Sequence, residues 1–555
     1  MTRDERVAGV PTDLAIIVRD VGALVLMQAA LMAVTTGVAV VFDEWYAALS
    51  FLAAAAVTAG VGWIARRRFE GAPAPKMKHG MVIAASGWFV TAIFGALPFF
   101  LAANLTPPGV MDTYVSAGAS YSPIPVDGTT TLSSLAYFQH PLHALFESMS
   151  GWTGSGLTMA IHEPSLPRAF QWWRSLIQYV GGVGVIVLTT AILARPGSGS
   201  YALYRAETRE ERIHPSIVHT VQTVWRIFAL YTVLAVVALF VAIRLSEPRL
   251  SLFETGWQAL NHAMTSLSTG GFSVTDNSIA SYDSPLIETV LLPVMTLGAI
   301  AFPIHYVMLH DRDPSPLWSD LQTRWLLLLL AVGSLVLTLQ NELVLTAAFE
   351  PTAAYFGFDT ASATATRDSV FQFVSALSCT GFQSSPIGDW GAGGKLVLSG
   401  AMVLGGAAGS TVGGIKIIRG YTIGKGIRWQ FSRVFLPSSA VVTTHIGDRT
   451  LDRNEMYEEF SEAAIVSLLW LILLLAGSVV LVNVASGVSY ADALFEVASA
   501  QGNVGLSTGI TGPSMSPIGE AMLVLNMWIG RLEIIPVLVL LTPEYWRTWL
   551  FGLEP

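Results

Sequence analysis

Long apolar runs separated by short polar segments fill most of the chain between residues 18 and 542. A run of about 20 apolar residues is long enough to cross the hydrocarbon core of a bilayer as a helix. The pattern predicts ten full spans, the eighth of which is interrupted by glycines. The spans are predicted at residues 18–42, 45–65, 81–103, 170–194, 216–243, 284–309, 322–349, 393–421, 458–485 and 517–542.

Four shorter apolar segments lie between spans, at residues 143–151, 253–266, 369–377 and 491–500. Each has about 9–14 residues, the length expected of a re-entrant half-helix rather than a span. A four-residue turn that ends in glycine follows each segment, and another span follows the turn. The turns are Thr153-Gly154-Ser155-Gly156, Ser268-Thr269-Gly270-Gly271, Ser378-Cys379-Thr380-Gly381 and Gly502-Asn503-Val504-Gly505.

The unit of span, half-helix, turn and span therefore occurs four times, and such repetition predicts pseudo-fourfold packing around an axis. The predicted fold is an all-α polytopic membrane protein with four helix–pore loop–helix repeats around one pore. Two N-terminal transmembrane helices, in residues 1–70, lie outside the repeats and are expected to pack at their edge. The repeats are predicted at 71–210, 211–315, 316–435, which contains a broken helix and a gating loop, and 436–555.

Composition supports a membrane protein: 52% of the residues are hydrophobic and 12% are charged, against about 25% charged in soluble domains. The single cysteine, Cys379, excludes a disulfide framework and a cysteine-based zinc cluster. No basic stretch for nucleic acid, Walker motif or dinucleotide fingerprint is present, so the chain is not expected to bind a nucleotide or any other cofactor of its own. No cleavable signal peptide is evident.

Basic residues predict the orientation, because cytoplasmic loops carry an excess of Lys and Arg. Residues 104–141 contain neither, whereas basic residues follow the second, fourth and eighth spans and flank the link after the sixth. The N-terminus is therefore predicted to be cytoplasmic, despite Arg244, Arg249, Arg367 and Lys395 on the other side. The residues that carry the bias are Arg66, Arg67, Arg68, Lys76, Lys78, Arg195, Arg205, Arg209, Arg212, Arg312, Arg324, Lys425, Arg428 and Arg433.

Four such turns around an axis suit a cation. Inward carbonyl oxygens replace a hydration shell, and each half-helix ends with about half a negative charge near the axis. Glycine reaches backbone conformations closed to other residues and leaves the lumen open. The turns contain no charged side chain, so selectivity would rest on backbone geometry. Alternatively, a small-residue turn serves helix packing, but four turns in register favour a pore.

Several motifs resemble the Trk/Ktr/HKT superfamily of potassium transporters, most closely the bacterial Trk membrane subunits, over nearly the whole chain. The matching stretches are Phe146-Glu147-Ser148-Met149-Ser150-Gly151-Trp152-Thr153, Trp173-Arg174-Ser175-Leu176, Gly181-Gly182-Val183-Gly184, Leu203-Tyr204-Arg205-Ala206-Glu207, Ser268-Thr269-Gly270-Gly271-Phe272-Ser273, Gly409-Ser410-Thr411-Val412-Gly413-Gly414-Ile415-Lys416 and Gly530-Arg531-Leu532-Glu533.

The resemblance implies a filter in which backbone carbonyls of the four turns bind potassium and the last glycine of each turn sets selectivity. These glycines are Gly156, Gly271, Gly381 and Gly505. In the family, serine at the first of these positions goes with sodium preference, so glycine here implies potassium. Gly154 departs from the pattern, because relatives usually carry a hydroxyl residue there, and we expect it to loosen the first turn.

The glycine-rich stretch 405–414 should unwind the eighth span, because glycine in a helix interior costs about 1 kcal/mol per residue. The resemblance implies that this stretch is an intramembrane gating loop and that Arg531 faces the pore beneath the filter. The alternatives are an ion pair of Arg531 with Glu533 and snorkelling of Lys416 to the interface. Glu147 is expected either to brace the first turn or to be purely structural. The predicted gating residues are Gly409, Ser410, Thr411, Gly413, Gly414, Lys416 and Arg531.

The predicted function is potassium uptake across the cytoplasmic (inner) membrane. A sodium-permeable or sodium-coupled transporter and the channel-like subunit of an ATP-driven potassium pump are the alternatives. An intramembrane enzyme is disfavoured, because His162-Glu163 lacks the second histidine of a zinc motif. The resemblance implies a homodimer and a separate ring of cytoplasmic nucleotide-binding regulatory subunits that docks on residues 195–215 and 419–455. Passive and coupled transport are both left open.

Overall fold

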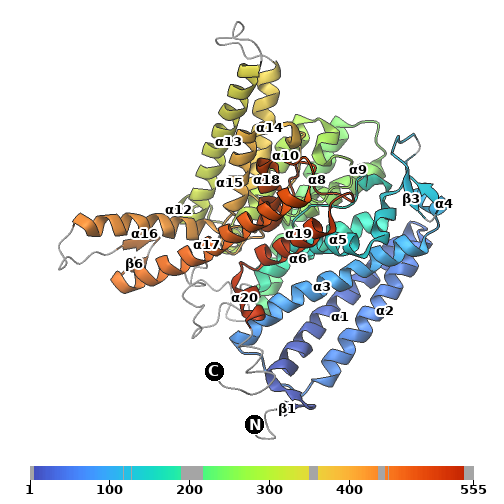
Figure 1. Ribbon diagram of the computed structural model, residues 1–555, viewed down its shortest axis with the longest axis horizontal. Helices are drawn as coiled ribbons and strands as arrows, with labels where there is room; N and C mark the ends of the chain where they lie inside the picture. The colour runs from blue at the N-terminus through green and yellow to red at the C-terminus, as the bar shows by residue number, and fades with distance from the viewer. Residues whose placement is uncertain are drawn as a thin grey trace.

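A computed structural model describes residues 6–116, 118–126, 128–188, 217–348, 360–435, 444–447 and 449–542. The described residues are mostly helical, which confirms the predicted all-α class (Figure 1). The strands described there form three short antiparallel hairpins outside the helical body. They pair β1 (Arg6–Val7) with β2 (Val10–Pro11), β3 (Ile124–Val126) with β4 (Thr129–Thr131), and β5 (Thr444–Ile446) with β6 (Arg449–Leu451).

Each predicted half-helix forms and packs between the two helices that flank it in its own repeat. In chain order, the three helices are α3 (Met77–Leu105), α5 (Pro141–Thr153) and α6 (Arg168–Leu188); α8 (Ile217–Ser246), α9 (Leu252–Leu267) and α10 (Pro285–Ala299); α13 (Leu321–Ala348), α14 (Thr360–Leu377) and α15 (Ala392–Val403); and α17 (Arg453–Val484), α18 (Tyr490–Gly502) and α19 (Pro517–Arg531).

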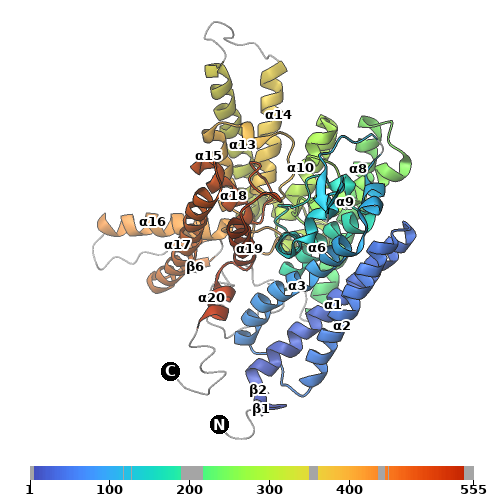
Figure 2. The same cartoon turned by 45° about the vertical axis from the view of Figure 1, so that its right-hand side comes forward.

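The second long helix of each repeat also packs against the half-helix of the next repeat. Helix α6 contacts α9, α10 contacts α14, α15 contacts α18, and α19 returns to contact α5. These contacts close a ring of four units in sequence order, with the red C-terminal helices beside the cyan first repeat (Figure 2). A single axis therefore relates the four half-helices.

Helices α1 (Thr12–Val41) and α2 (Trp45–Arg68) form a hairpin beside α3 at one edge of the molecule, where they were expected (Figure 1). The hairpin closes tightly at Gly22 and Gly62. A β-carbon on Gly22 would lie 2.9 Å from Cβ of Ala65, and one on Gly62 would lie 2.9 Å from the carbonyl oxygen of Gly22. Small residues thus let the two backbones approach, as in other helix pairs within membranes.

The predicted spans at 284–309 and 517–542 are wrong in one respect, because neither is a continuous helix. Helix α10 bends by 110° into α11 (Phe302–Tyr306) and the π-helix η7 (Val307–Asp311), and α19 bends by 116° into α20 (Ile535–Leu541). Ile300 is extended at the first bend, whereas Glu533 and Ile534 have φ of 56° and 72° at the second. Both bends precede a proline, which lacks the N–H needed to continue a helix.

Six described helices are each long and apolar enough to cross a membrane, or eight spans if each bent pair counts as one. The remaining predicted spans are α6, whose predicted end at 189–194 lies outside the described residues, and the interrupted eighth span. The latter consists of α15, an irregular loop and α16 (Ile417–Phe435). The third half-helix is longer than predicted: α14 begins at Thr360 rather than at 369.

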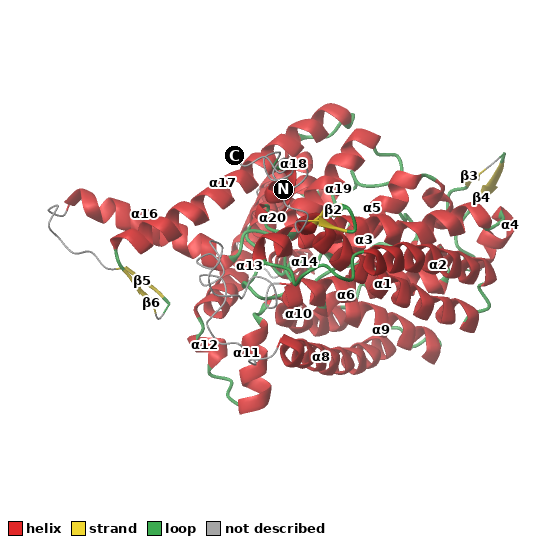
Figure 3. Ribbon diagram, turned by 90° about the horizontal axis from the view of Figure 1, so that it is seen from below, coloured by secondary structure: helices red, strands yellow, loops and turns green. Residues whose placement is uncertain are grey.

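The remaining described elements are short and connect the long helices. They are α4 (Pro108–Met111), η2 (Asp112–Tyr114), η3 (Ser134–Gln139), η4 (Glu163–Ser165), η6 (Ser278–Tyr282), α12 (Pro316–Ser319) and η8 (Ile387–Asp389). Helix α16 and the β5–β6 hairpin extend away from the helical body (Figure 3).

Candidate ion pathway

All four half-helices end with the same backbone motif. In each, the main-chain N–H of the third turn residue bonds to a carbonyl five residues earlier. The main-chain N–H of the second turn residue bonds to a carbonyl three residues earlier, and the two bonds together form a Schellman cap. The bonds that span five residues are 2.8–2.9 Å long, and they join the nitrogens of Ser155, Gly270, Thr380 and Val504 to the oxygens of Ser150, Thr265, Ser375 and Ser499.

The cap fixes the backbone of the turns. The second residue of each turn is left-handed, with φ of 68° at Gly154, 51° at Thr269, 53° at Cys379 and 55° at Asn503. Gly154 therefore keeps the conformation of its three counterparts, and it is the residue that adopts that conformation with the least strain. Cys379 is a free, buried thiol that fills the same structural position.

The last glycine of each turn also has positive φ, and these four glycines form a closed ring. A β-carbon on any of them would collide with the main chain of the adjacent turn, so the backbones are in contact. Added β-carbons at Gly156, Gly271, Gly381 and Gly505 would meet the carbonyl oxygens of Gly270, Thr380, Val504 and Ser155, respectively. The structure thus brings the four predicted turns together in the order of the repeats.

A cavity of about 140 Å³ opens on one side of this ring. The last glycine of every turn lines it, together with residues that follow the turns, including Thr158, Ser273 and Ser507. The glycine-rich loop between α15 and α16 does not line this cavity; it contacts residues at the start of the turns, such as Thr269 and Gly502. The ring of glycines therefore separates the cavity from the loop.

Each half-helix contains a polar residue nine positions before the last glycine of its turn, and the side chain of this residue supports the turn by a hydrogen bond. Glu147, His262, Gln372 and Glu496 occupy this position in the four half-helices. Each bonds to a hydroxyl residue just after the turn, which is Thr158, Ser273, Ser384 or Ser507. Sequence reasoning identified only the first of these residues. The shared spacing is a signal that comparison of the four repeats could have found.

The first brace contains a fully buried ion pair. The carboxylate of Glu147 accepts hydrogen bonds from Nε of Arg174 at 2.6 Å, from Thr158 at 3.0 Å and from the main-chain nitrogen of Met159 at 2.8 Å. Arg174, on α6, also donates to the carbonyl oxygen of Ser273 at 2.8 Å. Its guanidinium lies 4.1 Å from the ring centroid of Phe272. The pair therefore ties the first turn to the second.

Further side-chain hydrogen bonds join neighbouring repeats. Gln178 on α6 donates to the carbonyl oxygen of Gly270 and accepts from the nitrogen of Phe272 at 3.0 Å. Asn503 donates to the hydroxyl of Ser155 at 2.9 Å. These contacts join residues that lie about 90 to 350 positions apart, so sequence spacing gives no sign of them.

The irregular loop between α15 and α16 lies directly against the turns. Thr411 bonds to the hydroxyl of Thr269 at 2.8 Å and to the carbonyl oxygen of Gly298 at 2.9 Å. A β-carbon on Gly413 would collide with the carbonyl oxygen of Gly502. The loop is held to the bend after α10, where its main chain bonds to that of residues 298–302.

Arg531, at the end of α19, is buried beneath the first turn. Its guanidinium donates to the carbonyl oxygen of Thr411 at 2.7 Å and to that of Gly181 at 3.1 Å. One terminal nitrogen lies 3.8 Å from where a β-carbon on Gly154 would be. Arg531 therefore connects the loop to helix α6 and lies beside the first turn.

Glu533 pairs with different cations. Its carboxylate lies 2.7 Å from Arg419 and 3.8 Å from Nζ of Lys416. Lys416 is 4% exposed and donates to the carbonyl oxygen of Val412 in its own loop. The snorkelling alternative for Lys416 is therefore wrong, because its side chain folds into the protein rather than toward the interface. Glu533, two residues after Arg531, therefore holds the C-terminal end of the loop rather than Arg531.

Four re-entrant half-helices around a common axis, enclosed by apolar helices, define a multi-pass membrane transporter. The sequence profile of the TrkH family, described as cation transport proteins, matches residues 79–547. The chain therefore belongs to the TrkH family of cation transport proteins. Membership identifies a transporter rather than an enzyme, and it confirms the resemblance drawn from the motifs.

Individual relatives match along most of their length. The chain is 32% identical over 474 residues to an uncharacterized cation transporter of Methanocaldococcus jannaschii, covering 85% of this chain and 84% of the relative. It is 29% identical over 545 residues to the Trk system potassium uptake protein TrkH of Escherichia coli, covering 96% and 99%.

The fold is similar to the crystal structure of the potassium transporter TrkH from Vibrio parahaemolyticus. The TM-score is 0.74 at 24% sequence identity, over 96% of this chain and 100% of that one. The similarity shows a shared fold.

The buried brace yields a test of stability. Glu147→Gln removes the carboxylate that is paired with the buried Arg174 guanidinium, and breaking a buried ion pair in this way costs about 3–5 kcal/mol. We expect the free energy of unfolding of the purified chain, measured by SDS titration in micelles, to fall by that amount. Glu70→Gln is the control, because Glu70 pairs with Arg67 at the exposed surface and should change little. Equal stability of the two variants would contradict the brace.

Proposed function

We propose that the chain mediates potassium uptake through one pore, in which main-chain carbonyls of the four turns replace the hydration shell of the ion. The ring of Gly156, Gly271, Gly381 and Gly505 carries the proposal, because each of these glycines lies against the main chain of the adjacent turn and all four line one cavity. The cavity lined by the same four glycines would receive the ion before it loses water. Potassium is the substrate, and no cofactor of the chain itself is needed.

The electrostatics favour a cation. Each turn follows the C-terminus of a half-helix, and four helix ends together supply about two negative charges around the axis. No Lys, Arg, Asp or Glu lies in the turns, so an anion would meet only the negative ends of the helices. The braces at Glu147 and Glu496 hold the turns from behind, which would keep the ring at a fixed diameter.

The preference for potassium over sodium would rest on Gly156. Relatives of this chain are named as potassium uptake proteins, and glycine at this position keeps the ring free of a side chain. A sodium-permeable pore is the alternative function. It predicts no loss of potassium preference when Gly156 is replaced.

The loop between α15 and α16 would be the gate. It contacts the first residues of the filter turns, and Arg531 fastens it to Gly181 across the axis. A positive charge in this place also opposes the passage of a cation. Opening would require the loop and the guanidinium to move together, so loss of either contact should favour the open state.

The location and partners are part of the same proposal. We place the chain in the cytoplasmic membrane with a cytoplasmic N-terminus, as a homodimer whose two chains each contain one pore. A ring of nucleotide-binding subunits would dock on the basic segments. One of these, 195–215, lies outside the described residues. The other includes α16, which extends from the body with Phe431, Val434 and Phe435 exposed (Figure 3).

Gly156→Ser tests the filter. A β-carbon there would collide with the carbonyl oxygen of Gly270 and lie 3.2 Å from Cα of Gly505, so the ring must change shape. We expect the ratio of potassium to sodium uptake in reconstituted vesicles to fall by about tenfold, or roughly 1.4 kcal/mol of discrimination. Gly400→Ser is the matched control, because Gly400 lies on α15 with open space around it. An unchanged ratio in Gly156→Ser would reject the filter assignment.

Arg531→Gln tests the gate. The substitution removes the charge beneath the filter and weakens two charge-assisted hydrogen bonds, each worth about 1.5–3 kcal/mol. We expect the initial rate of potassium uptake into vesicles to rise about tenfold, whereas the ratio of potassium to sodium uptake should stay the same. Arg68→Gln serves as control, because Arg68 is exposed at the end of α2, where it donates to the carbonyl oxygen of Ala8 and lies over the ring of Phe69. A folded Arg531→Gln protein with wild-type or slower flux would argue against the gate.

A further inference from the structure

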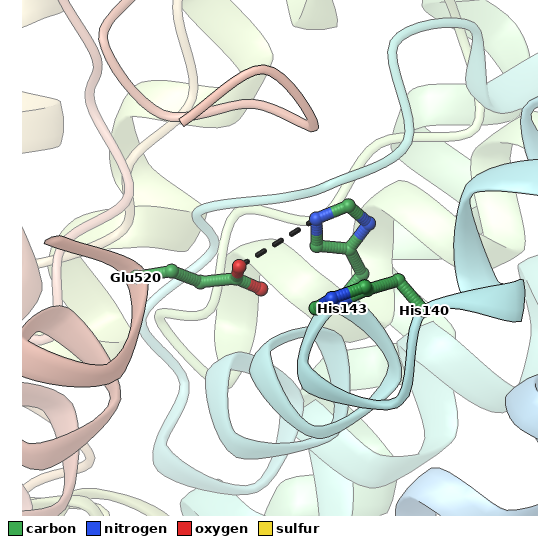
Figure 4. A group of neighbouring side chains, drawn as sticks. All are labelled: His140, His143 and Glu520. Atoms are coloured by element: carbon green, nitrogen blue, oxygen red, sulfur yellow. Dashed lines mark ion pairs between the residues drawn. The ribbon is translucent and has the colours of Figure 1, made fainter. Parts of the chain in front are cut away.

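Two histidines and a glutamate meet where the first and fourth repeats touch. His140 immediately precedes α5, His143 lies in its first turn, and Glu520 lies in the first turn of α19. One ligand atom from each of the three side chains lies within 4.8 Å of the other two. Figure 4 shows the Glu520 carboxylate directed toward the His143 ring, with the ring of His140 beside it. The Nε2 of His143 is 3.5 Å from the Glu520 carboxylate.

In His143 and Glu520, the atoms that could bind a metal are not engaged in hydrogen bonds. The Nδ1 of His143 lies 2.9 Å from the carbonyl oxygen of Tyr137. A carbonyl only accepts, so Nδ1 carries the proton and Nε2 keeps its lone pair toward Glu520. Such a second bond typically orients a histidine that binds a metal. Glu520 is 0% exposed, and neither of its carboxylate oxygens receives a hydrogen bond.

A buried carboxylate without donors costs free energy, so its presence calls for a partner. A cation that bonds directly to the carboxylate would supply one. Imidazole nitrogen with carboxylate oxygen is a ligand set for zinc and related transition metals, whereas magnesium and calcium prefer oxygen alone. Zinc sites of this kind use three protein ligands and a water molecule in a fourth position. His140 is exposed and provides a path for entry.

We propose that His140, His143 and Glu520 bind one divalent transition metal ion of the zinc class. The site lies on the side of the membrane that the basic residues predict to be external. Its ligands come from the half-helix that ends in the first filter turn and from the helix that ends at Arg531. A bound ion would therefore link two elements of the ion pathway, independently of which ion the pathway carries.

The test uses the metal-free full chain in lipid nanodiscs. Calorimetry measures the binding of Zn²⁺, and the visible absorption of added Co²⁺ reports nitrogen and oxygen coordination. We expect one ion per chain and a higher temperature of unfolding with zinc. His143→Ala and Glu520→Gln should each weaken zinc binding at least about tenfold. Acidification should weaken it too, because imidazole binds a metal only when deprotonated.

His310→Ala is the control, because His310 is exposed and stacks on Tyr306 away from the cluster; its zinc affinity should equal that of the wild type. His140→Ala keeps the test informative if a buried substitution prevents folding, since His140 lies at the surface, and it too should lose affinity. Zinc affinity that is the same in wild type, His140→Ala and the folded cluster variants would overturn the proposal. So would the absence of saturable binding to the wild type.

Discussion

The capping of four helix ends inside the membrane is the constraint on which the rest of the structure depends. Backbone groups at membrane depth must find partners within the protein. Each half-helix satisfies its last carbonyls with a Schellman cap, which forces its next residue into the left-handed conformation. The chain then leaves the helix toward the axis, where only glycine fits between adjacent turns. The geometry of the four turns thus follows from a local rule applied four times, and the contacts of each repeat with the next close the ring.

Much of this arrangement could be predicted from local pattern. The short apolar segments, the turns that end in glycine and the N-terminal hairpin each leave a signal within about 30 residues of sequence. The two sharp bends were missed, although a proline follows each, because long apolar runs continue through Ile300 and Ile534. The braces at His262, Gln372 and Glu496 were missed because they look like ordinary polar residues until the repeats are aligned. Contacts such as Gln178 with Gly270 depend on packing between repeats.

The loop between α15 and α16 departs from the fourfold pattern of the repeats. Only the third repeat, within the described residues, has its second long helix interrupted by a glycine-rich loop. The loop is held near its middle by the hydrogen bond from Arg531 to Thr411 and at its C-terminal end by the ion pairs of Glu533 with Lys416 and Arg419. Both fastenings come from residues around the bend between α19 and α20. Movement at that bend would therefore displace the loop and, through the contact of α19 with α5, the first half-helix.

The position of bound ions tests the central claim most directly. Crystals of the full chain grown with rubidium, which substitutes for potassium and scatters anomalously, would locate ions without reference to flux. The account predicts anomalous peaks on the axis enclosed by Gly156, Gly271, Gly381 and Gly505, with main-chain oxygens as their nearest protein atoms. Ordered rubidium bound elsewhere in the membrane region, with none inside that ring, would contradict it.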